Sequence, residues 1–372
     1  DMRIGIDARE LFGQTTGVGR YLTNLLMEWS DQCKTGYTVI LYSPASEDRA
    51  VDLFNRLKLT GNPTFKHRRL EGGQGTLWEQ IQLCKTANAD NLDVFFAPNY
   101  SAPLMLQIPF VLALHDVSYF SRPDWFNWRE GLRRRLLAGK SARLAHTVLT
   151  LSQFSREEIV NHLNINSDRI IVTPLGTSGS RVGHIGSKDS HLVLFAGSCF
   201  TRRRLPDLIR AFAIVQSQES RARLSIVGDN RTYPHIDLEN IVNDSGIANY
   251  VSIENWINDQ DLTELYRKAK VFAFLSEYEG FGLPPLEALA FGTPSVMLDT
   301  KIAREVMGEA ASFVPLNDIH STVSALSELL WDSPKRRAIL KAAPRILARH
   351  NWADTATRTM GAVEQAATDR DD

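Results

Sequence analysis

Two glutamates, Glu279 and Glu287, stand eight residues apart in the stretch SEYEGFGLPPLEALAFGTPSV, Ser276 to Val296. The apolar run VFAFL directly before this stretch predicts a buried strand. The two consecutive prolines are typical of a first helical turn, where a missing N–H costs little. The pattern therefore predicts a strand, a loop that holds Glu279, and a helix with Glu287 in its first turn.

Such a loop has groups that can bind a sugar attached to phosphate. Gly280 and Gly282 allow backbone N–H groups to come close to a ligand, and a helix start favours phosphate. Carboxylates accept strong hydrogen bonds from sugar and ribose hydroxyls. From the residues alone, a plain loop followed by a helix-favouring glutamate explains the stretch about equally well.

The elements that must position these residues form a regular alternation. Strands that alternate with helices predict parallel sheets covered on both faces. The Gly- and Ser-rich run Leu175 to Ser190 is interpreted as a linker. We therefore predict an α/β fold of two Rossmann-like, doubly wound lobes that face an interlobe cleft. Helical runs separate the strand-like runs RIGI, TVILY, DVFFA, FVLALH, TVLTL and IIVTP, and, after the linker, LVLFAG, RLSIVG, VSI, VFAFL and PSVML.

The linker also sets the expected domain boundaries. Residues 1–176 form the first lobe and residues 177–352 the second, while the amphipathic C-terminal run 353–372 is expected to pack back on the first lobe. In open parallel sheets, ligands bind beyond the carboxyl ends of the strands. That rule selects Asp7, Pro98-Asn99, His115-Asp116, Ser152, Gly197-Ser198, Gly228-Asp229 and Ser276 to Gly282.

The stretch EGFGLPPLEALAFGTPSV resembles the signature of the retaining glycosyltransferases of family four, which have the two-lobed GT-B fold. Their pattern is a glutamate, seven residues and a second glutamate, with GFG, a proline and EA in between. LWEQ and FFAPNYSAPL resemble stretches of the mannosyltransferase-like branch of that family. The resemblance covers almost the whole chain and includes GIDARELFGQTTGVGRYLTNLL, LALHDVSYF and LFAGSCFTRRRLPDLIRAF.

This resemblance implies roles for individual residues. Glu279 would lie near the hydroxyls of the donor sugar, Glu287 would hold the ribose, and His115 would contact the transferred sugar. Arg203 stands where the family usually has a lysine that binds the diphosphate. The first lobe would bind the acceptor and the second the nucleotide sugar. Further donor contacts would come from the backbone of Phe281, Gly282 and Leu283 and from a loop with Gly17 and Gly19.

Two departures from the family pattern concern the phosphate contacts. Arg203 replaces the usual lysine, and arginine holds phosphate with a planar fork rather than a point charge. Because Arg202 and Arg204 flank it, any of the three could bind the diphosphate. Ser198 stands where many members carry an arginine, so one positive contact is missing or comes from a neighbouring arginine.

The resemblance implies catalysis without a metal ion or another cofactor, since the positive charge comes from side chains. The internal run Asp259-Gln260-Asp261 is interpreted as a helix N-cap rather than a metal site. Three widely separated cysteines indicate neither a disulfide framework nor a zinc site. The family transfers its sugar with retention, which implies front-face attack with the leaving phosphate taking the proton of the acceptor.

Together these inferences predict a hexosyltransferase that moves mannose from GDP-mannose to a glycan or lipid-linked acceptor in bacterial polysaccharide or lipopolysaccharide biosynthesis. A UDP-sugar donor carrying glucose, galactose or N-acetylhexosamine is the first alternative. A non-catalytic nucleotide-sugar-binding or scaffold protein is disfavoured because Glu279, Glu287 and His115 are all present. A dehydrogenase is disfavoured because Gly17-Val18-Gly19 lacks the third glycine of a dinucleotide loop.

The charge balance and the segment Arg122 to Arg143 bear on partners and location. With 42 basic and 43 acidic residues the net charge is -1, so we expect no nucleic-acid binding. The absence of a signal-peptide pattern predicts a cytoplasmic protein.

The segment Arg122 to Arg143 combines Trp125, Phe126 and Trp128 with many arginines. It is either a solvated basic helix packed through its leucines or a site of peripheral contact with the anionic inner face of the plasma membrane.

Overall fold

The computed structural model describes residues 1–13, 17–32, 35–73, 75–177 and 191–369. The chain forms two compact units. Most of the expected linker, residues 178–190, lies outside the described residues. The first unit contains Asp1–Pro123, Trp128–Gly176 and Trp352–Asp372, and the second contains Asp124–Asn127 and Thr177–Asn351.

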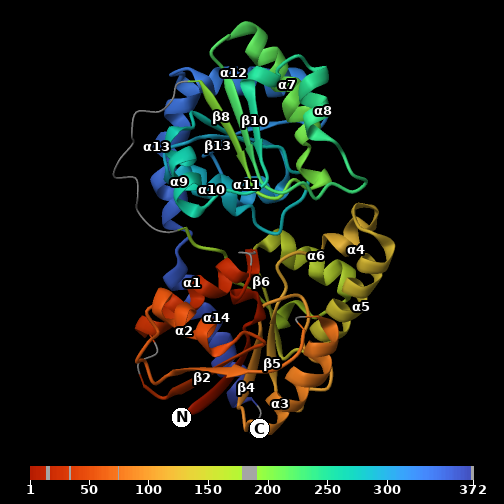
Figure 1. The fold of residues 1–372 in the computed structure, drawn as a ribbon, viewed down its shortest axis with the longest axis vertical. Helices are drawn as coiled ribbons and strands as arrows, with labels where there is room; N and C mark the ends of the chain where they lie inside the picture. The colour runs from red at the N-terminus through yellow and green to blue at the C-terminus, as the bar shows by residue number, and fades with distance from the viewer. Residues whose placement is uncertain (14–16, 33–34, 74, 178–190, 370–372) are drawn as a thin grey trace. The chain divides into compact units, whose positions relative to one another are not determined.

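The described part of the first unit contains a sheet of seven parallel strands in the order β3-β2-β1-β4-β5-β6-β7 (Figure 1). The strands β4, β5 and β6 are buried along their whole length, as expected for parallel strands covered on both faces. The seven strands are β1 (Met2–Asp7), β2 (Tyr37–Ser43), β3 (Phe65–Arg69), β4 (Val94–Ala97), β5 (Phe110–Ala113), β6 (Thr147–Thr150) and β7 (Ile170–Val172).

Strand β3 was not predicted from the sequence. It reads FKHRR, and of its side chains Phe65 alone is buried. It lies at the edge of the sheet, where basic side chains can face solvent and also discourage pairing with another chain. An edge strand of this composition lacks the apolar run on which the prediction of the other strands depended.

Helices cover the first sheet. Side-chain hydrogen bonds fix the start of α6 and the position of α14. Ser152 caps α6 by accepting a hydrogen bond from the backbone N–H of Ser155, so it is a structural residue. The last helix, α14, packs against α1, β4 and β5, and Nε1 of Trp29 donates to the carbonyl of Ala356 at 3.0 Å. The helical elements are η1 (Arg9–Leu11), α1 (Gly17–Gln32), α2 (Glu47–Arg56), the π-helical turn η2 (Trp78–Leu83), α3 (Cys84–Ala89), α4 (Ser118–Ser121), η3 (Pro123–Trp125), α5 (Trp128–Leu144), α6 (Gln153–Leu163), η4 (Ser167–Arg169) and α14 (Trp352–Thr368).

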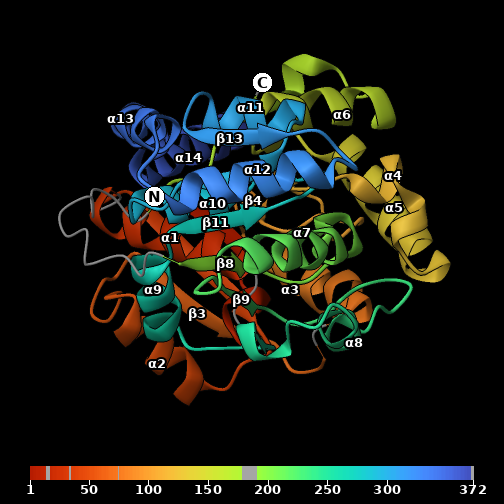
Figure 2. The same cartoon turned by 90° about the horizontal axis from the view of Figure 1, so that it is seen from above.

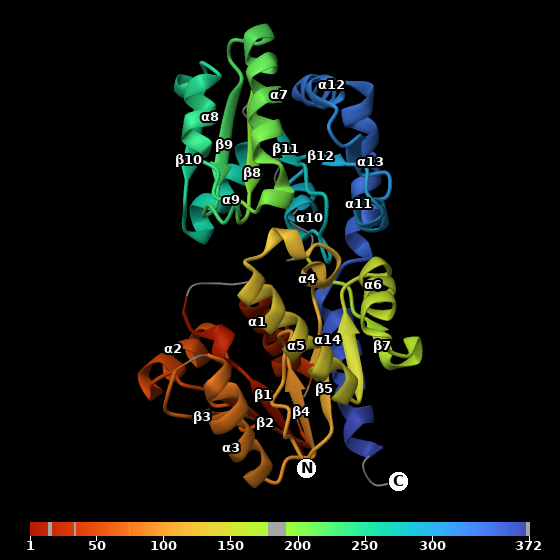
Figure 3. The same cartoon turned by 90° about the vertical axis from the view of Figure 1, so that its right-hand side faces the viewer.

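The second unit repeats this plan with six parallel strands among its described residues, in the order β10-β9-β8-β11-β12-β13. Helices α7 and α12 pack side by side over this sheet (Figures 2 and 3). The strands are β8 (Leu192–Ala196), β9 (Arg223–Val227), β10 (Val251–Glu254), β11 (Val271–Phe274), β12 (Ser295–Leu298) and β13 (Ala311–Val314). The helical elements are η5 (Thr201–Arg203), α7 (Leu205–Gln218), α8 (Leu238–Asp244), η6 (Ala248–Tyr250), α9 (Asp259–Lys268), α10 (Leu283–Ala290), α11 (Lys301–Met307), α12 (Ile319–Leu330) and α13 (Pro334–Ala348).

The predicted α/β fold with two parallel-sheet lobes is confirmed. In each sheet the strand order reverses at one point, between β1 and β4 in the first unit and between β8 and β11 in the second. Ligands of such sheets bind at this switch point, beyond the carboxyl ends of the strands. The residues that follow β8 and β11, and those that follow β1 and β4, are therefore the places to look for a site.

Candidate active site

The loop after β8 begins with a glycine that makes room for an arginine. Gly197 has a φ of +130°, and a Cβ built on it would lie 2.5 Å from Nη1 of Arg203. The Arg203 side chain crosses this loop, and its Nη1 donates to the carbonyl of Ser198 at 2.9 Å. Its guanidinium carbon lies 4.9 Å from the ring centroid of Phe274 at the end of β11. The backbone at Gly197 and Ser198 thus holds Arg203 at the switch point of the second sheet.

The buried Arg203 forms an ion pair with Glu279, a largely covered side chain in the loop after β11. Nε of Arg203 donates to Oε1 of Glu279 at 2.9 Å, and Nη2 donates to Oε2 at 3.3 Å. The hydroxyl of Ser276 donates to the same Oε1 at 2.8 Å. Nη2 of Arg202, also buried, lies 3.8 Å from Oε2. Two cations therefore face one carboxylate, which leaves the cluster with an excess of positive charge.

The electrostatics of this cluster keep Glu279 ionised. Burial by itself would raise the pKa of Glu279, but the charges of Arg203 and Arg202 and the hydrogen bonds from Arg203 and Ser276 outweigh it, so the pKa is lowered. Arg203 has five N–H donors, of which three have partners among the described residues. The remaining two N–H groups can donate to an anionic ligand without breaking the pair with Glu279.

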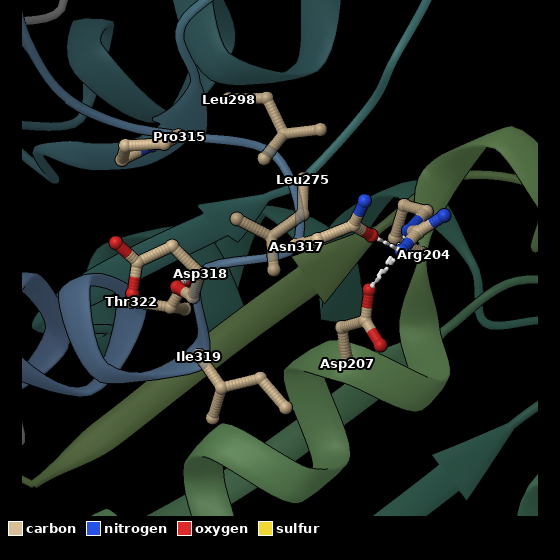
Figure 4. A pocket seen from close by; sticks show the side chains of 9 residues that line it. All are labelled: Arg204, Asp207, Leu275, Leu298, Pro315, Asn317, Asp318, Ile319 and Thr322. Carbon is tan, nitrogen blue, oxygen red and sulfur yellow. Dashed lines mark hydrogen bonds and ion pairs between the residues drawn. The ribbon is translucent and has the colours of Figure 1, made fainter.

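Arg204 has a different and structural role. Its Nε donates to Asp207 at 2.7 Å, and its Nη2 donates to the side-chain oxygen of Asn317 (Figure 4). Its Nη1 donates to Glu277 at 3.1 Å. It has a φ of +51° and precedes the first residue of α7. These contacts hold α7 against neighbouring loops, and among the described residues it is Arg202 and Arg203, not Arg204, that form an ion pair with Glu279.

Helix α10 has the two prolines in its first turn, as the sequence predicts, but Glu287 is not in that turn. The helix starts at Leu283, so Glu287 is its fifth residue and lies in the second turn. There its Oε2 accepts a hydrogen bond from the hydroxyl of Tyr266 at 3.3 Å. The expectation of a first-turn position was wrong because the helix begins one residue before the two prolines.

In the loop ahead of α10, a ligand would meet backbone groups rather than the side chains of Phe281 and Gly282, because one is buried and the other has no side chain beyond hydrogen. Gly282 caps the helix with a φ of +90°, a conformation that favours glycine. The ring of Phe281 is buried and packs edge-on against His350, with 5.3 Å between centroids. Because the two prolines lack an N–H, Leu283 and Leu286 supply the backbone donors of the first four helical residues. A phosphate at this helix start would therefore meet fewer amides than at an ordinary helix.

A pocket lies beside the loop after β9. Gly228 has a φ of +143°, and a Cβ built on it would lie 2.0 Å from the carbonyl oxygen of Gly197, so the two strand-end loops touch through their backbones. The pocket is open to solvent and lies at the carboxyl ends of β9 and β10. Its lining includes Asn230, His235 and Asn255. This pocket adjoins the loop that holds Arg203, and the sequence had indicated it only through the strand-end rule.

In the first unit, His115 lies beyond the end of β5 and is held in a neutral form. Its Nε2 lies 2.9 Å from the carbonyl oxygen of Pro98, which only accepts, so Nε2 carries the proton and donates. Burial lowers the pKa of His115 to about 4, although Pro98 and the charge of Asp116 oppose the shift. The ring of Tyr21 packs edge-on against it at 4.6 Å. A neutral imidazole with its proton on Nε2 has a hydrogen-bond acceptor at Nδ1.

Gly17 and Gly19 do not form the loop that the resemblance implies. Both lie in the first turn of α1, and Gly17 is its first residue. Tyr21 follows Gly17 by four residues on the same helix, and its ring contacts His115, so the start of α1 and His115 belong to one region. Any phosphate contact from these glycines would come from the amides of a helix start.

The sequence did not predict a buried charge network at the switch point of the first sheet. Arg9 forms ion pairs with Asp7 at 2.9 Å and with Glu79, and Ser101 also donates to Glu79 at 2.8 Å. Glu79 and its neighbour Gln80 come from the LWEQ stretch, and Gln80 accepts a hydrogen bond from the backbone N–H of Leu104. Burial raises the pKa of Asp7 to about 6. This network fixes the loop after β4, whose Pro98 positions His115.

The run Asp259-Gln260-Asp261 opens α9, but the cap is the residue before it. The side chain of Asn258 accepts from the backbone N–H of Asp261 at 2.8 Å. Across the part of the chain that the structure describes, no group of three or more His, Cys, Asp or Glu side chains could hold a metal ion.

Comparison with known proteins identifies two matching family models and several relatives. A family model described as Glycosyltransferase Family 4 matches residues 15–181, and one described as Glycosyl transferases group 1 matches residues 182–346. The chain is 25% identical over 282 residues to O-antigen chain mannosyltransferase B of Escherichia coli, covering 73% of this chain and 74% of the relative. It is 27% identical over 253 residues to the MMP alpha-(1->4)-mannosyltransferase of Mycolicibacterium hassiacum, covering 64% and 60%.

The fold is also similar to that of solved structures. The structure of HepE from Anabaena in complex with UDP and glucose superposes with a TM-score of 0.70 over 97% of this chain and 98% of that one, at 18% identity. The two family models together span both units, from residue 15 to residue 346. The chain therefore belongs to the glycosyltransferases that combine a family 4 domain with a group 1 domain, and it is a hexosyltransferase with the GT-B fold.

Proposed function

We propose that the second unit binds a nucleotide diphosphate sugar and that the enzyme transfers mannose from GDP-mannose. The observation that carries the proposal is the buried cluster of Arg202, Arg203 and Glu279, with its excess positive charge and two N–H donors still available on Arg203. Guanidinium groups suit a diphosphate, and an ionised carboxylate suits sugar hydroxyls. The choice of mannose rests on the names of both relatives, which are mannosyltransferases.

The proposed mechanism follows from the charges that develop. When the bond between the anomeric carbon and the diphosphate breaks, negative charge grows on the leaving oxygen and positive character on the sugar. Arg202 and Arg203 would stabilise the leaving group. Glu279 would accept a hydrogen bond from a sugar hydroxyl, Glu287 would hold the ribose, and His115 would contact the transferred sugar through its acceptor nitrogen.

We propose that the sugar is transferred with retention and without a metal ion. The acceptor oxygen would bond to the anomeric carbon on the face that the diphosphate leaves, and its proton would pass to the leaving phosphate oxygen. The arginine cluster supports this proposal because it supplies the positive charge that a metal ion would otherwise bring to the diphosphate.

A UDP-sugar is the second candidate donor. It is favoured by the likeness to HepE, whose structure contains UDP and glucose. For the acceptor we propose a glycan or lipid-linked glycan of a bacterial surface polysaccharide, reached from the inner face of the plasma membrane, because the E. coli relative is named for an O-antigen chain.

Thermal unfolding in the presence of GDP, UDP, GDP-mannose and UDP-glucose tests the donor. A ligand at about a hundred times its Kd adds about 2.7 kcal/mol to the free energy of unfolding, so the true donor should raise Tm clearly. We expect GDP and GDP-mannose to do so and UDP to have little effect. Stabilisation by UDP-glucose alone would replace the proposed donor, and no response to any nucleotide would contradict nucleotide-sugar binding.

The anomeric configuration of the product tests retention. The enzyme with its preferred donor should release an α-linked mannose product, or α-mannose during slow hydrolysis without acceptor, when the donor is GDP-α-mannose. Proton NMR of the product at the earliest measurable time reports this. An initial β product would show inversion and contradict the proposed mechanism.

A further inference from the structure

Helix α5 of the first unit packs through small residues and leaves its large ones outside. Its buried residues are Gly131, Ala138, Gly139, Ser141 and Ala142. The sequence-based interpretation of a helix packed through its leucines is therefore wrong. Leu132, Leu136 and Leu144 are 43%, 54% and 56% exposed. The small residues let the helix approach its neighbours α4 and α6 closely (Figure 3). The exposed leucines make the opposite face unusually apolar for a surface helix.

Every exposed side chain of α5 is either large and apolar or basic. None of the exposed positions is acidic or neutral polar. At helical spacing these residues fall on one side of the helix, with basic and apolar side chains interleaved. We call this set the α5 surface, and it consists of Trp128, Leu132, Leu136 and Leu144 together with Arg129, Arg133, Lys140 and Arg143.

The charge of α5 is strongly positive in a nearly neutral chain. The helix holds six basic residues and one acid, Glu130, which gives +5, while the whole chain has a net charge of -1. Arg133 donates to Glu130 at 2.7 Å and Arg134 does so at 2.7 Å, so this carboxylate is already paired within the helix. The one acidic side chain of the helix is therefore offset by two arginines, and the helix keeps its net positive charge.

A helix of the same unit provides the contrast. Helix α2 also has an exposed apolar residue, Val51, and exposed basic residues, Arg49 and Arg56. These are mixed with the exposed acids Glu47, Asp48 and Asp52. The α2 surface is thus an ordinary solvated helix face with both signs of charge, and the segregation on α5 is not a general property of this unit.

From these observations we propose that the α5 surface docks on an anionic lipid bilayer, with its leucines and Trp128 at the level of the acyl chains and its basic side chains on the phosphate headgroups. Interleaved apolar and basic side chains on one helix face suit a membrane interface, where both kinds of group are needed at once. A nucleic acid would use the basic side chains and leave the leucines exposed to water. A second copy of the chain would place like charges against each other.

The docking surface is narrower than the segment that the sequence indicated. Trp125 lies in a part of the chain that belongs to the second unit, and its ring packs edge-on against Tyr278. Trp128 is 67% exposed and remains as the aromatic anchor. Among the residues described, none of the helices has the length and apolarity needed to cross a bilayer, so the proposed contact is peripheral.

Vesicle flotation of the full chain tests the proposal, which concerns a surface that the proposed reaction does not use. The native chain should float with vesicles of phosphatidylcholine and phosphatidylglycerol, and not with phosphatidylcholine alone. Each basic residue near an anionic surface contributes roughly a fivefold gain in binding, so Arg129→Gln with Lys140→Gln should weaken it roughly 25-fold. Leu132→Ser with Leu136→Ser should weaken it by at least about tenfold.

The matched control is Arg49→Gln with Val51→Ser on α2, which should bind vesicles as the native chain does. Unchanged Tm and unchanged stabilisation by the donor nucleotide would show that the α5 variants are folded. Absence of binding to anionic vesicles, or equal loss in the α2 control, would overturn the proposal. So would a native chain that binds an oligonucleotide, or dimerises, through the α5 surface without binding vesicles.

Discussion

In both units the candidate functional side chains follow the strands of a parallel sheet, but the charge states of these side chains differ. Glu279 in the second unit is stabilised in its charged form, whereas His115 and Asp7 in the first unit are shifted towards their neutral forms. In the second unit the pKa of Glu279 is lowered, because two arginines and two hydrogen-bonding partners outweigh its burial. In the first unit burial dominates, so the pKa of His115 falls to about 4 and the pKa of Asp7 rises to about 6. Strand-end loops therefore set position, while the neighbours of each group set its charge.

This difference matches what each half is proposed to bind. A diphosphate carries charge and calls for a charged, preassembled partner such as the pair of Arg203 and Glu279. A sugar hydroxyl is neutral, so a neutral acceptor such as His115 can bind it as well as a carboxylate can. The comparison predicts that substitutions in the second unit change donor binding and catalysis, while those in the first change the response to pH.

Removal of Glu279 should have the largest effect. Glu279→Ala should lower the transfer rate by at least about a hundredfold, the cost of losing one preorganised group at the reacting centre. The chain should remain folded, as judged by circular dichroism. Glu309→Ala, which removes the exposed partner of Arg345, is the matched control and should leave the rate unchanged. Normal turnover by Glu279→Ala would remove this carboxylate from the site.

Substitution of Arg203 and of Arg204 should separate a ligand-binding role from a structural one. Arg203→Ala should weaken binding of the donor nucleotide by about ten- to a hundredfold, since a hydrogen bond to a charged group contributes about 1.5–3 kcal/mol. Arg204→Ala should change that affinity little and lower the free energy of unfolding instead, because Arg204 holds α7. Isothermal titration calorimetry and urea unfolding measure the two quantities. Equal affinity in Arg203→Ala and the native chain would transfer the role to Arg202.

The last effect concerns the pH dependence of stability rather than the transfer rate or the donor affinity. Because the pKa of His115 is about 4 in the folded chain and 6.5 in the unfolded one, the unfolded chain binds more protons between these values. Stability from His115 is therefore complete above about pH 6.5 and is lost as the pH falls towards 4. The difference in free energy of unfolding between the native chain and His115→Asn should shrink over this interval, by at most about 3 kcal/mol.

The free energy of unfolding has to be compared between the native chain and His115→Asn, because Asp7 changes the stability of both chains with pH in the opposite direction to His115. The raised pKa of Asp7 means that the folded chain binds the extra proton, so its contribution falls as the pH rises from 3.8 to about 6. Urea unfolding of both chains at a series of pH values cancels the Asp7 term. A difference that stays constant from pH 7 to pH 4.5 would mean that His115 is not desolvated.

The sequence predicted most strands of both sheets because parallel strands buried on both faces are continuous apolar runs. It missed β3, whose basic residues suit an edge. It also placed Glu279 in the loop after β11 and Glu287 in α10, because glycines, prolines and apolar runs are local signals. The predicted loop position of Gly17 and Gly19, which lie in the first turn of α1, and the predicted first-turn position of Glu287, which is the fifth residue of α10, were wrong because element ends depend on packing.

By itself, the sequence determined the α/β alternation, the signature loop from Ser276 to Val296 and the family to which the chain belongs. The tertiary structure decided which arginine faces Glu279, which charge each buried group carries and which side of α5 is exposed. Local residue patterns encode secondary structure. Pairing, desolvation and exposure arise between residues far apart in the chain, so they became visible when the folded neighbours of each side chain were known.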